Sequence, residues 1–215
     1  MLRKLLLVAA ATAMPIGFIA ASGGLASAKA APPVDATTAT ITCTGITGSA
    51  KFSPAVTTDE TAGSGTTTIK AALTGCTTND GVTVTGAKVA GTLSTTRTAG
   101  ENGCTALAGG SSAAGNLVTT WKTSPKLVSK TSTIAVTSIA GSIGSDGNAT
   151  FSIPGNTPNG TPSGSFQGTN HGASDATTAQ TTTSAASILS TCEGKKGLKS
   201  IDIESPASGA AVSLG

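Results

Sequence analysis

The stretch TTTIKAALTGCTTNDGVTVTGAKVAGTL, residues 66–93, decides the class of fold. It holds two runs of alternating residues on either side of an Asn-Asp-Gly turn at positions 79–81, a sequence typical of β-hairpins. Apolar residues occupy every second position from Ile69 to Leu73, and valine alternates with threonine from Val82 to Thr85. After Gly86 the alternation resumes in a shifted phase, which indicates a bulge at this glycine. We therefore predict two antiparallel strands.

Short strands of the same kind recur along the chain. Alternation predicts them at residues 41–44, 117–121, 131–139, 149–153, 164–169, 198–203 and 212–214. Segments 45–65 and 109–115 are expected to be connections, and residues 185–192 a short helix with Ile188 and Leu189 facing inward. Many short strands with little helix predict a single β-sandwich with Greek-key connections, similar to an immunoglobulin domain in general architecture. A closed β-barrel is the alternative.

Residues 1–30 have the layout of a secretory signal peptide. Arg3 and Lys4 precede an apolar stretch that runs to about Ala21, and two triplets of the form small-x-small end at Ala28 and Ala30. We therefore expect this segment to be removed on export. Residues 31–40 are then an extended lead-in rich in threonine and proline, and residues 41–215 form a single all-β domain. No later stretch is long or apolar enough to serve as a transmembrane segment.

Charge and aromatic content narrow the classes of partner. Without the three cations of the signal, ten basic side chains face ten acidic ones, so the exported chain lacks the basic face that nucleic-acid binding requires. Its aromatic residues are Phe52, Trp121, Phe151 and Phe166, too few for a groove that stacks sugars or bases or for the girdles of an outer-membrane barrel. Trp121 is the largest core candidate, and its indole N–H needs a partner when buried.

Four cysteines, Cys43, Cys76, Cys104 and Cys192, lie in the part of the chain expected to be exported. Their number is even and no two form a CxxC pair, so disulfides are favoured over a metal site. Three pairings are possible. We favour Cys43 with Cys76, which ties the first strand to the central hairpin, and Cys104 with Cys192, which ties the end of the chain to its middle. No metal or cofactor site is predicted.

A succession of short motifs spans nearly the whole exported chain: Cys43-Thr44-Gly45, Phe52-Ser53-Pro54, Leu73-Thr74-Gly75-Cys76, Gly103-Cys104-Thr105-Ala106-Leu107, Thr120-Trp121 and Cys192. In this succession the chain resembles small secreted proteins of actinobacteria whose function is unknown. The resemblance implies a location outside the cell or in the cell envelope. It carries no catalytic pattern that transfers to this sequence.

Candidate catalytic and metal-binding residues are few. His171 is the one histidine, and Asp175 lies four residues after it. In a serine hydrolase, His171 would be the base and Asp175 the acid that orients it. No serine stands in a Gly-x-Ser-x-Gly frame, however. Asp80 and Asp146 each precede a glycine and are interpreted as turn formers. A loose calcium site at Asp146 and Asn148 would lack the further oxygen ligands that calcium needs.

Two classes of function remain open. The first, which we favour, is a non-enzymatic secreted or envelope-associated module that binds a polymer or protein of the envelope, or a ligand in a cavity. The second is a secreted hydrolase with a site near His171, which converging polar groups around that residue would support. Six lysines are interpreted as solvated surface, with contact to anionic envelope polymers as the alternative: Lys122, Lys126, Lys130, Lys195, Lys196 and Lys199.

Overall fold

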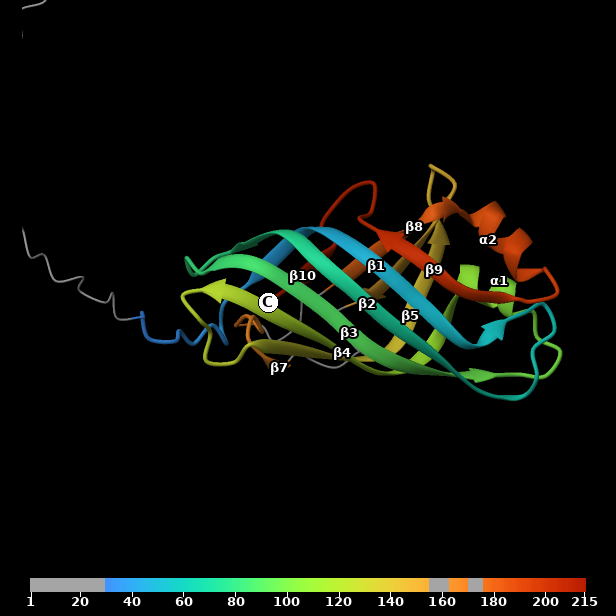
Figure 1. Cartoon of the computed structure of the whole chain (residues 1–215), viewed down its shortest axis with the longest axis horizontal. Coiled ribbons are helices and arrows are strands. Elements are labelled where there is room, and N and C mark those ends of the chain that lie inside the picture. Colours follow the sequence, from blue (N-terminus) through green and yellow to red (C-terminus); the bar gives the residue numbers. More distant parts are fainter. Residues whose placement is uncertain (1–29, 155–162, 170–175) are drawn as a thin grey trace, which may run out of the picture. The chain divides into compact units, whose positions relative to one another are not determined.

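The structure of the protein, a computed structural model, describes residues 30–154, 163–169 and 176–215. Residues from Ala31 to Gly215 form one compact unit. Residues 1–29 of the predicted signal, and both His171 and Asp175, lie outside the described residues. The described part forms ten strands and two short helices (Figure 1): β1 Ile41–Val56, β2 Gly63–Thr78, β3 Thr83–Arg97, α1 Gly103–Gly109, β4 Gly110–Ser124, β5 Thr131–Ile143, β6 Asn148–Pro154, β7 Ser163–Gly164, β8 Ala176–Ser184, α2 Ala185–Cys192, β9 Leu198–Glu204 and β10 Val212–Leu214.

The strands form a continuous antiparallel ring. β1 to β6 follow one another across the sheet, β8 pairs with β6, and β9 joins β8 back to β1. β10 also lies between β8 and β1, beyond the end of β9, while β7 pairs with β5. The all-β class is therefore confirmed. The Greek-key sandwich is not confirmed, because short connections pair most strands with their neighbours in sequence, as in a meander.

The central hairpin has the local geometry that its sequence predicts. The carboxylate of Asp80 accepts a hydrogen bond from the N–H of Val82 at 3.1 Å, and Gly81 has φ of 78°, which glycine adopts without steric cost. The pairing of β3 with β4 shifts register between Val84 and Gly86, which confirms the bulge. The alternation of apolar and polar residues in this part of the sequence thus matches the alternation of inward-facing and outward-facing side chains in the sheet.

Two segments expected to be connections are strands instead. Most of residues 45–65 extends β1 to Val56 and begins β2 at Gly63, and residues 110–115 begin β4. Their glycines serve close packing. A Cβ atom on Gly48 would collide with the backbone carbonyl of Lys70 on the neighbouring strand, so this position excludes any larger residue without forming a turn.

Both helices begin at a capping side chain. Ser184 caps α2, the predicted helix, in which Ile188 is buried and Leu189 packs against the core. α1 was not predicted, because its sequence is short and rich in glycine and alanine. Its start is fixed by Asn102, whose side-chain oxygen accepts a hydrogen bond from the N–H of Thr105 at 3.1 Å.

One end of the ring interior is filled by aromatic rings. Trp121 is 4% exposed, and its indole N–H donates to the hydroxyl of Ser132 at 2.7 Å, which supplies the predicted partner. Its ring meets the fully buried ring of Phe166 edge to face, with centroids 5.2 Å apart. The Ser132 hydroxyl donates in turn to the carbonyl of Ser165. At this end of the interior, the apolar surface is therefore closely packed and these polar groups are hydrogen-bonded.

Residues 34–39 close the same end. Val34 pairs in parallel with Leu127, and Ala36 and Ala39 are buried. The carbonyl of Ala36 accepts a hydrogen bond from the N–H of Phe166 at 2.9 Å. This part of the expected lead-in is consequently packed onto the ring.

Two disulfides join distant parts of the chain in the pairing that the sequence predicts. Cys43 and Cys76 stand directly opposite each other on β1 and β2, and the bond between them links the two strands. Cys104 of α1 is bonded to Cys192 of α2. The first disulfide ties two neighbouring strands of the ring, and the second ties the two helices.

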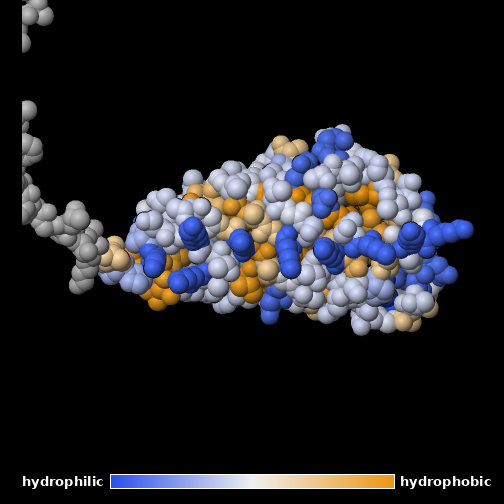
Figure 2. Space-filling view, in the orientation of Figure 1, coloured by the Kyte–Doolittle hydropathy of each residue, from blue (hydrophilic) through white to orange (hydrophobic). Residues whose placement is uncertain are grey.

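Charged side chains are spaced along the outer face of the ring. Lys70 and Lys88 are exposed on β2 and β3, and Figure 2 shows hydrophilic side chains spaced along this face. Neither helix of the described residues has the length and apolar character needed to cross a membrane.

Candidate functional site

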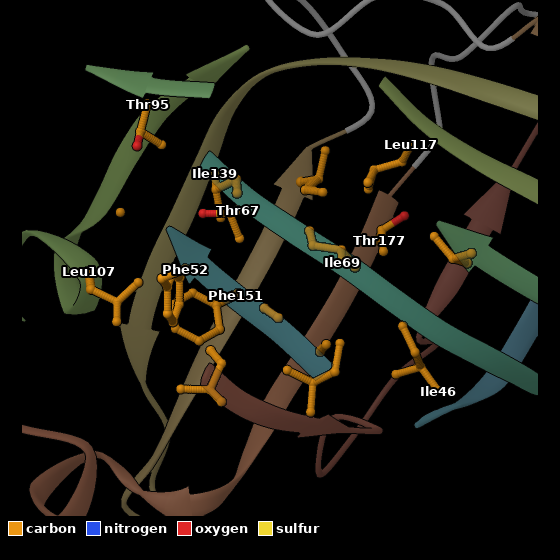
Figure 3. Close-up of a pocket in the computed structure, with 17 residues that line it drawn as sticks. Ile46, Phe52, Thr67, Ile69, Thr95, Leu107, Leu117, Ile139, Phe151 and Thr177 are labelled. Atoms are coloured by element: carbon orange, nitrogen blue, oxygen red, sulfur yellow. The ribbon is translucent and has the colours of Figure 1, made fainter. Parts of the chain in front are cut away.

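The second half of the ring interior is hollow. A cavity of about 100 Å³ lies there, and side chains from all the ring strands (β1 to β6, β8 and β9) and from α1 line it (Figure 3). Strands that fill the first half reach this one too. β4, for example, contributes Trp121 to the packed half and Leu117 to the cavity wall.

Alternation along the strands makes the cavity wall apolar. Ile46, Ala50 and Phe52 lie at even positions of β1, and Ile201 and Ile203 at odd positions of β9, so that each set faces the interior. The polar side chains of the wall are threonines, and no charged side chain of the described residues lines this cavity. A wall of this kind binds through apolar contact and excludes ions.

Small residues in the wall explain the empty space. Ala50 on β1 and Ala179 on β8 face the interior, and Gly110 adds no side chain at the start of β4. The chain is also poor in large aromatic residues, and its single tryptophan is used in the other half. An apolar cavity of this order accepts small apolar molecules.

Several of the apolar side chains around the cavity are only partly buried. Phe52, Ile69, Leu107, Ile139 and Phe151 pack against the core while each keeps part of its surface accessible. In Figure 3, Phe52, Phe151 and Leu107 lie toward one end of the cavity. Apolar surface that is accessible to water is unfavourable. Binding of an apolar molecule that covers this surface therefore lowers the free energy.

A second cavity of about 90 Å³ adjoins the first. The two share four lining residues, namely Phe52, Thr67, Thr95 and Leu107. Charged side chains enter the lining only in the second cavity, where Glu60, Arg97 and Glu101 contribute. The combined space therefore runs from an apolar part inside the ring to a polar part beside α1.

The charged groups of the second cavity are held in a fixed arrangement. Glu60 and Arg97 form a buried ion pair, with side chains 6% and 10% exposed. Arg97 also donates to the carbonyls of Pro54 at 2.7 Å and Ala55 at 3.0 Å, and the Glu60 carboxylate accepts from the N–H of Thr57 at 3.0 Å. This network joins the end of β1 and the following loop to the end of β3.

Asp146 accepts from the N–H of Asn148 at 3.1 Å, which fits its role as a turn former. Among the described residues no group of three or more candidate side chains is arranged to hold a metal ion.

The six lysines do not form one cluster. Lys122 pairs with Gly86 toward the packed end of the ring, whereas Lys195 and Lys196 follow α2 at the end where β9 meets Val56. All six are exposed. The interpretation as solvated surface fits this separation.

Sequence reasoning allowed for a cavity but assigned no residue to its wall, and it missed the ion pair. The apolar alternation was visible, but strand pairings that close the ring join residues far apart in sequence, such as Ala50 with Ile201. Glu60 and Arg97 are 37 positions apart and stand in no motif. Alanine at inward positions between larger apolar residues was the one signal that pointed to unfilled space.

Comparison of the chain with protein-family models, with curated proteins and with solved structures finds no match. The fold and cavity define the protein as an all-β, disulfide-linked ring with an apolar internal site.

Proposed function

We propose that the protein is a non-enzymatic binding protein of the cell envelope or the external medium, and that it holds a small apolar molecule inside the ring. The observation that carries this proposal is the apolar cavity, whose wall draws on every strand of the ring. A site of this kind surrounds a ligand with apolar side chains, and its lining offers no group suited to acid–base or nucleophilic chemistry.

The free energy for binding comes from covering apolar surface. Each Å² of such surface removed from water contributes about 25 cal/mol. Phe52, Ile139 and Phe151 each keep accessible surface around the cavity and would lose it to a bound ligand. The wall is held by strand pairing around the whole ring, so little conformational entropy would be lost when a ligand enters.

Export is the second part of the proposal. Two disulfides are consistent with an oxidising location outside the cytosol. The signal-like residues 1–30 and the resemblance to secreted actinobacterial proteins support the same location.

Filling the cavity tests the proposal. Ala179→Phe places a phenyl side chain in the cavity. We expect this variant to weaken binding of an apolar dye at least about tenfold, because the dye and the new side chain need the same space. The dye is N-phenyl-1-naphthylamine, which is uncharged and fluoresces in apolar surroundings. Titration of purified, exported protein gives the dissociation constant.

Ala90→Phe is the matched control. Ala90 lies on β3 with its side chain exposed on the outer face, so this variant adds the same ring without occupying the cavity and should bind the dye as the unmodified protein does. Equal binding by Ala179→Phe, with both variants folded by circular dichroism, would show that the dye binds elsewhere. Absence of dye binding to the unmodified protein would contradict the proposal.

The hydrolase alternative makes a separate prediction. We expect His171→Ala to leave dye binding unchanged and to abolish no hydrolytic activity, because the sequence offers His171 no nucleophile in a recognisable frame. The purified protein and this variant are assayed side by side on chromogenic ester and glycoside substrates. Hydrolysis by the unmodified protein that disappears in a folded His171→Ala variant would establish the enzyme instead.

A further inference from the structure

Resting on the proposed function, we infer that the ligand is an amphiphile with an uncharged, hydroxyl-bearing head group. Its apolar tail occupies the cavity inside the ring, and its head lies where this cavity meets the second one, at Thr67 and Thr95. Two neighbouring spaces of different polarity carry the inference, because the first has no charged lining residue and the second has three.

The two spaces are continuous in their walls. Phe52 and Leu107 line both, and so do Thr67 and Thr95. In Figure 3 these four residues lie toward the same end of the cavity, while Ile46 and Leu117 lie toward the other. A molecule that enters beside α1 would thus reach the apolar part only by passing between two threonines and two large apolar side chains.

The polar groups at this junction are hydroxyls with bonding capacity to spare. Within the described residues, the side-chain oxygens of Thr67 and Thr95 have no hydrogen-bond partner. Each hydroxyl can donate one hydrogen bond and accept two. A hydroxyl head group matches both abilities, whereas a hydrocarbon end would leave these oxygens without a partner.

Charge at the second cavity selects against anionic head groups. The guanidinium of Arg97 is already paired with Glu60 and bonded to two carbonyls. The lining adds the carboxylate of Glu101. A carboxylate or phosphate head would have to displace Glu60 from Arg97 and would face two negative charges.

A cationic head group gains too little at the same place. The Glu60 carboxylate is the buried one, and it already accepts from Arg97 and from the N–H of Thr57. Glu101 is exposed to water, which weakens its attraction for a cation. The free-energy cost of removing an ammonium group from water is therefore larger than the attraction that these carboxylates provide. An uncharged head group can still bond to the remaining lone pairs of Glu60 and the remaining N–H groups of Arg97.

A series of amphiphiles with one tail and different heads tests the inference. 1-Decanol and 1-monodecanoylglycerol carry hydroxyl heads, decanoate is the anion, and decyltrimethylammonium is the cation. Each competes with N-phenyl-1-naphthylamine for the purified, exported protein at pH 7, below its micellar concentration. We expect the hydroxyl compounds to displace the dye at concentrations at least about tenfold lower than either ion.

Thr95→Val tests the position of the head. Valine has nearly the same shape as threonine and lacks its hydroxyl. We therefore expect displacement by 1-decanol to weaken about three- to tenfold, measured relative to the dissociation constant of the dye for the same variant. Thr92→Val is the control, because Thr92 lies on the outer face of the same strand. Equal displacement by 1-decanol in both variants would contradict the placement at Thr95.

The outcomes separate this inference from the proposed function. Stronger displacement by decanoate or by decyltrimethylammonium would overturn the uncharged head group and leave the apolar site standing. Dye binding that none of the four amphiphiles displaces would do the same. A protein that binds neither dye nor amphiphile would overturn both.

Discussion

Replacement of Trp121 by alanine is expected to lower the free energy of unfolding by about 3–5 kcal/mol. The side chain is 4% exposed and fills the packed half of the ring, with the edge-to-face contact to Phe166 and the hydrogen bond to Ser132. Truncation removes all three contributions and leaves a cavity. No other tryptophan or tyrosine exists in the chain to refill it.

Denaturant unfolding followed by far-ultraviolet circular dichroism measures the change. Val128→Ala is the control, because Val128 is 68% exposed and its truncation should change the free energy of unfolding by no more than about 0.5 kcal/mol. An unchanged midpoint in Trp121→Ala would mean that the indole is exposed in solution. Trp121 would then become a candidate binding residue.

The Trp121→Ala variant also tests whether the two halves of the interior are independent. The cavity for the proposed ligand is lined by Leu117 on the same strand but not by Trp121. If the variant remains folded, dye binding should persist, because the wall of the cavity is built from other residues.

Local features of the fold were predictable because they depend on neighbours in sequence. The alternation from Ile69 to Leu73, the Asn-Asp-Gly turn and the bulge at Gly86 each depend on a few adjacent residues. The capping of α2 by Ser184 is of the same kind. In each of these places, local preference and final structure agree.

Features that depend on distant pairing were not predictable. Gly48 suits both a loop and a crowded strand, and only the approach of Lys70 decides between them. Closure of the ring depends on β9, near the end of the chain, finding β1 near its start. A sandwich and a ring share the same alternation along each strand, so the sequence pattern could not separate them.

The candidate site was hidden for the same reason. Apolar residues facing inward are read as core from the sequence, whether or not the core is full. Only the assembled ring shows that Trp121 and Phe166 fill one half while Ala50 and Ala179 leave space in the other. The ion pair of Glu60 with Arg97 likewise requires the loop after β1 to meet the end of β3. The hydrogen bond from the N–H of Glu60 to the carbonyl of Glu101 helps to hold them together.

The two disulfides stand in different relations to this site. Cys43 and Cys76 join β1 to β2, and the Cys43 carbonyl accepts from the N–H of Ala211 near the packed half. Cys104 and Cys192 join α1 to α2, and α1 contributes Leu107 to both cavities. Removing each disulfide should therefore have a different effect on ligand binding.

Removal of the Cys104–Cys192 disulfide, by Cys104→Ala with Cys192→Ala, is expected to lower the free energy of unfolding by about 4–5 kcal/mol, from the chain entropy of its long loop. The sequence separation is 88 residues. Removal of Cys43–Cys76, with a separation of 33 residues, should cost about 3–4 kcal/mol. Denaturant unfolding of both double variants measures these losses against the unmodified protein.

Dye binding distinguishes the roles of the two bonds beyond stability. At a temperature where both double variants are folded, loss of Cys104–Cys192 should weaken binding of N-phenyl-1-naphthylamine several-fold, because α1 is freed from α2 and Leu107 is no longer held against the ligand. Loss of Cys43–Cys76 should leave binding unchanged, since neither cysteine lines either cavity. Equal weakening in both variants would show that binding follows overall stability, and that the link between the helices has no specific part in holding the wall of the site.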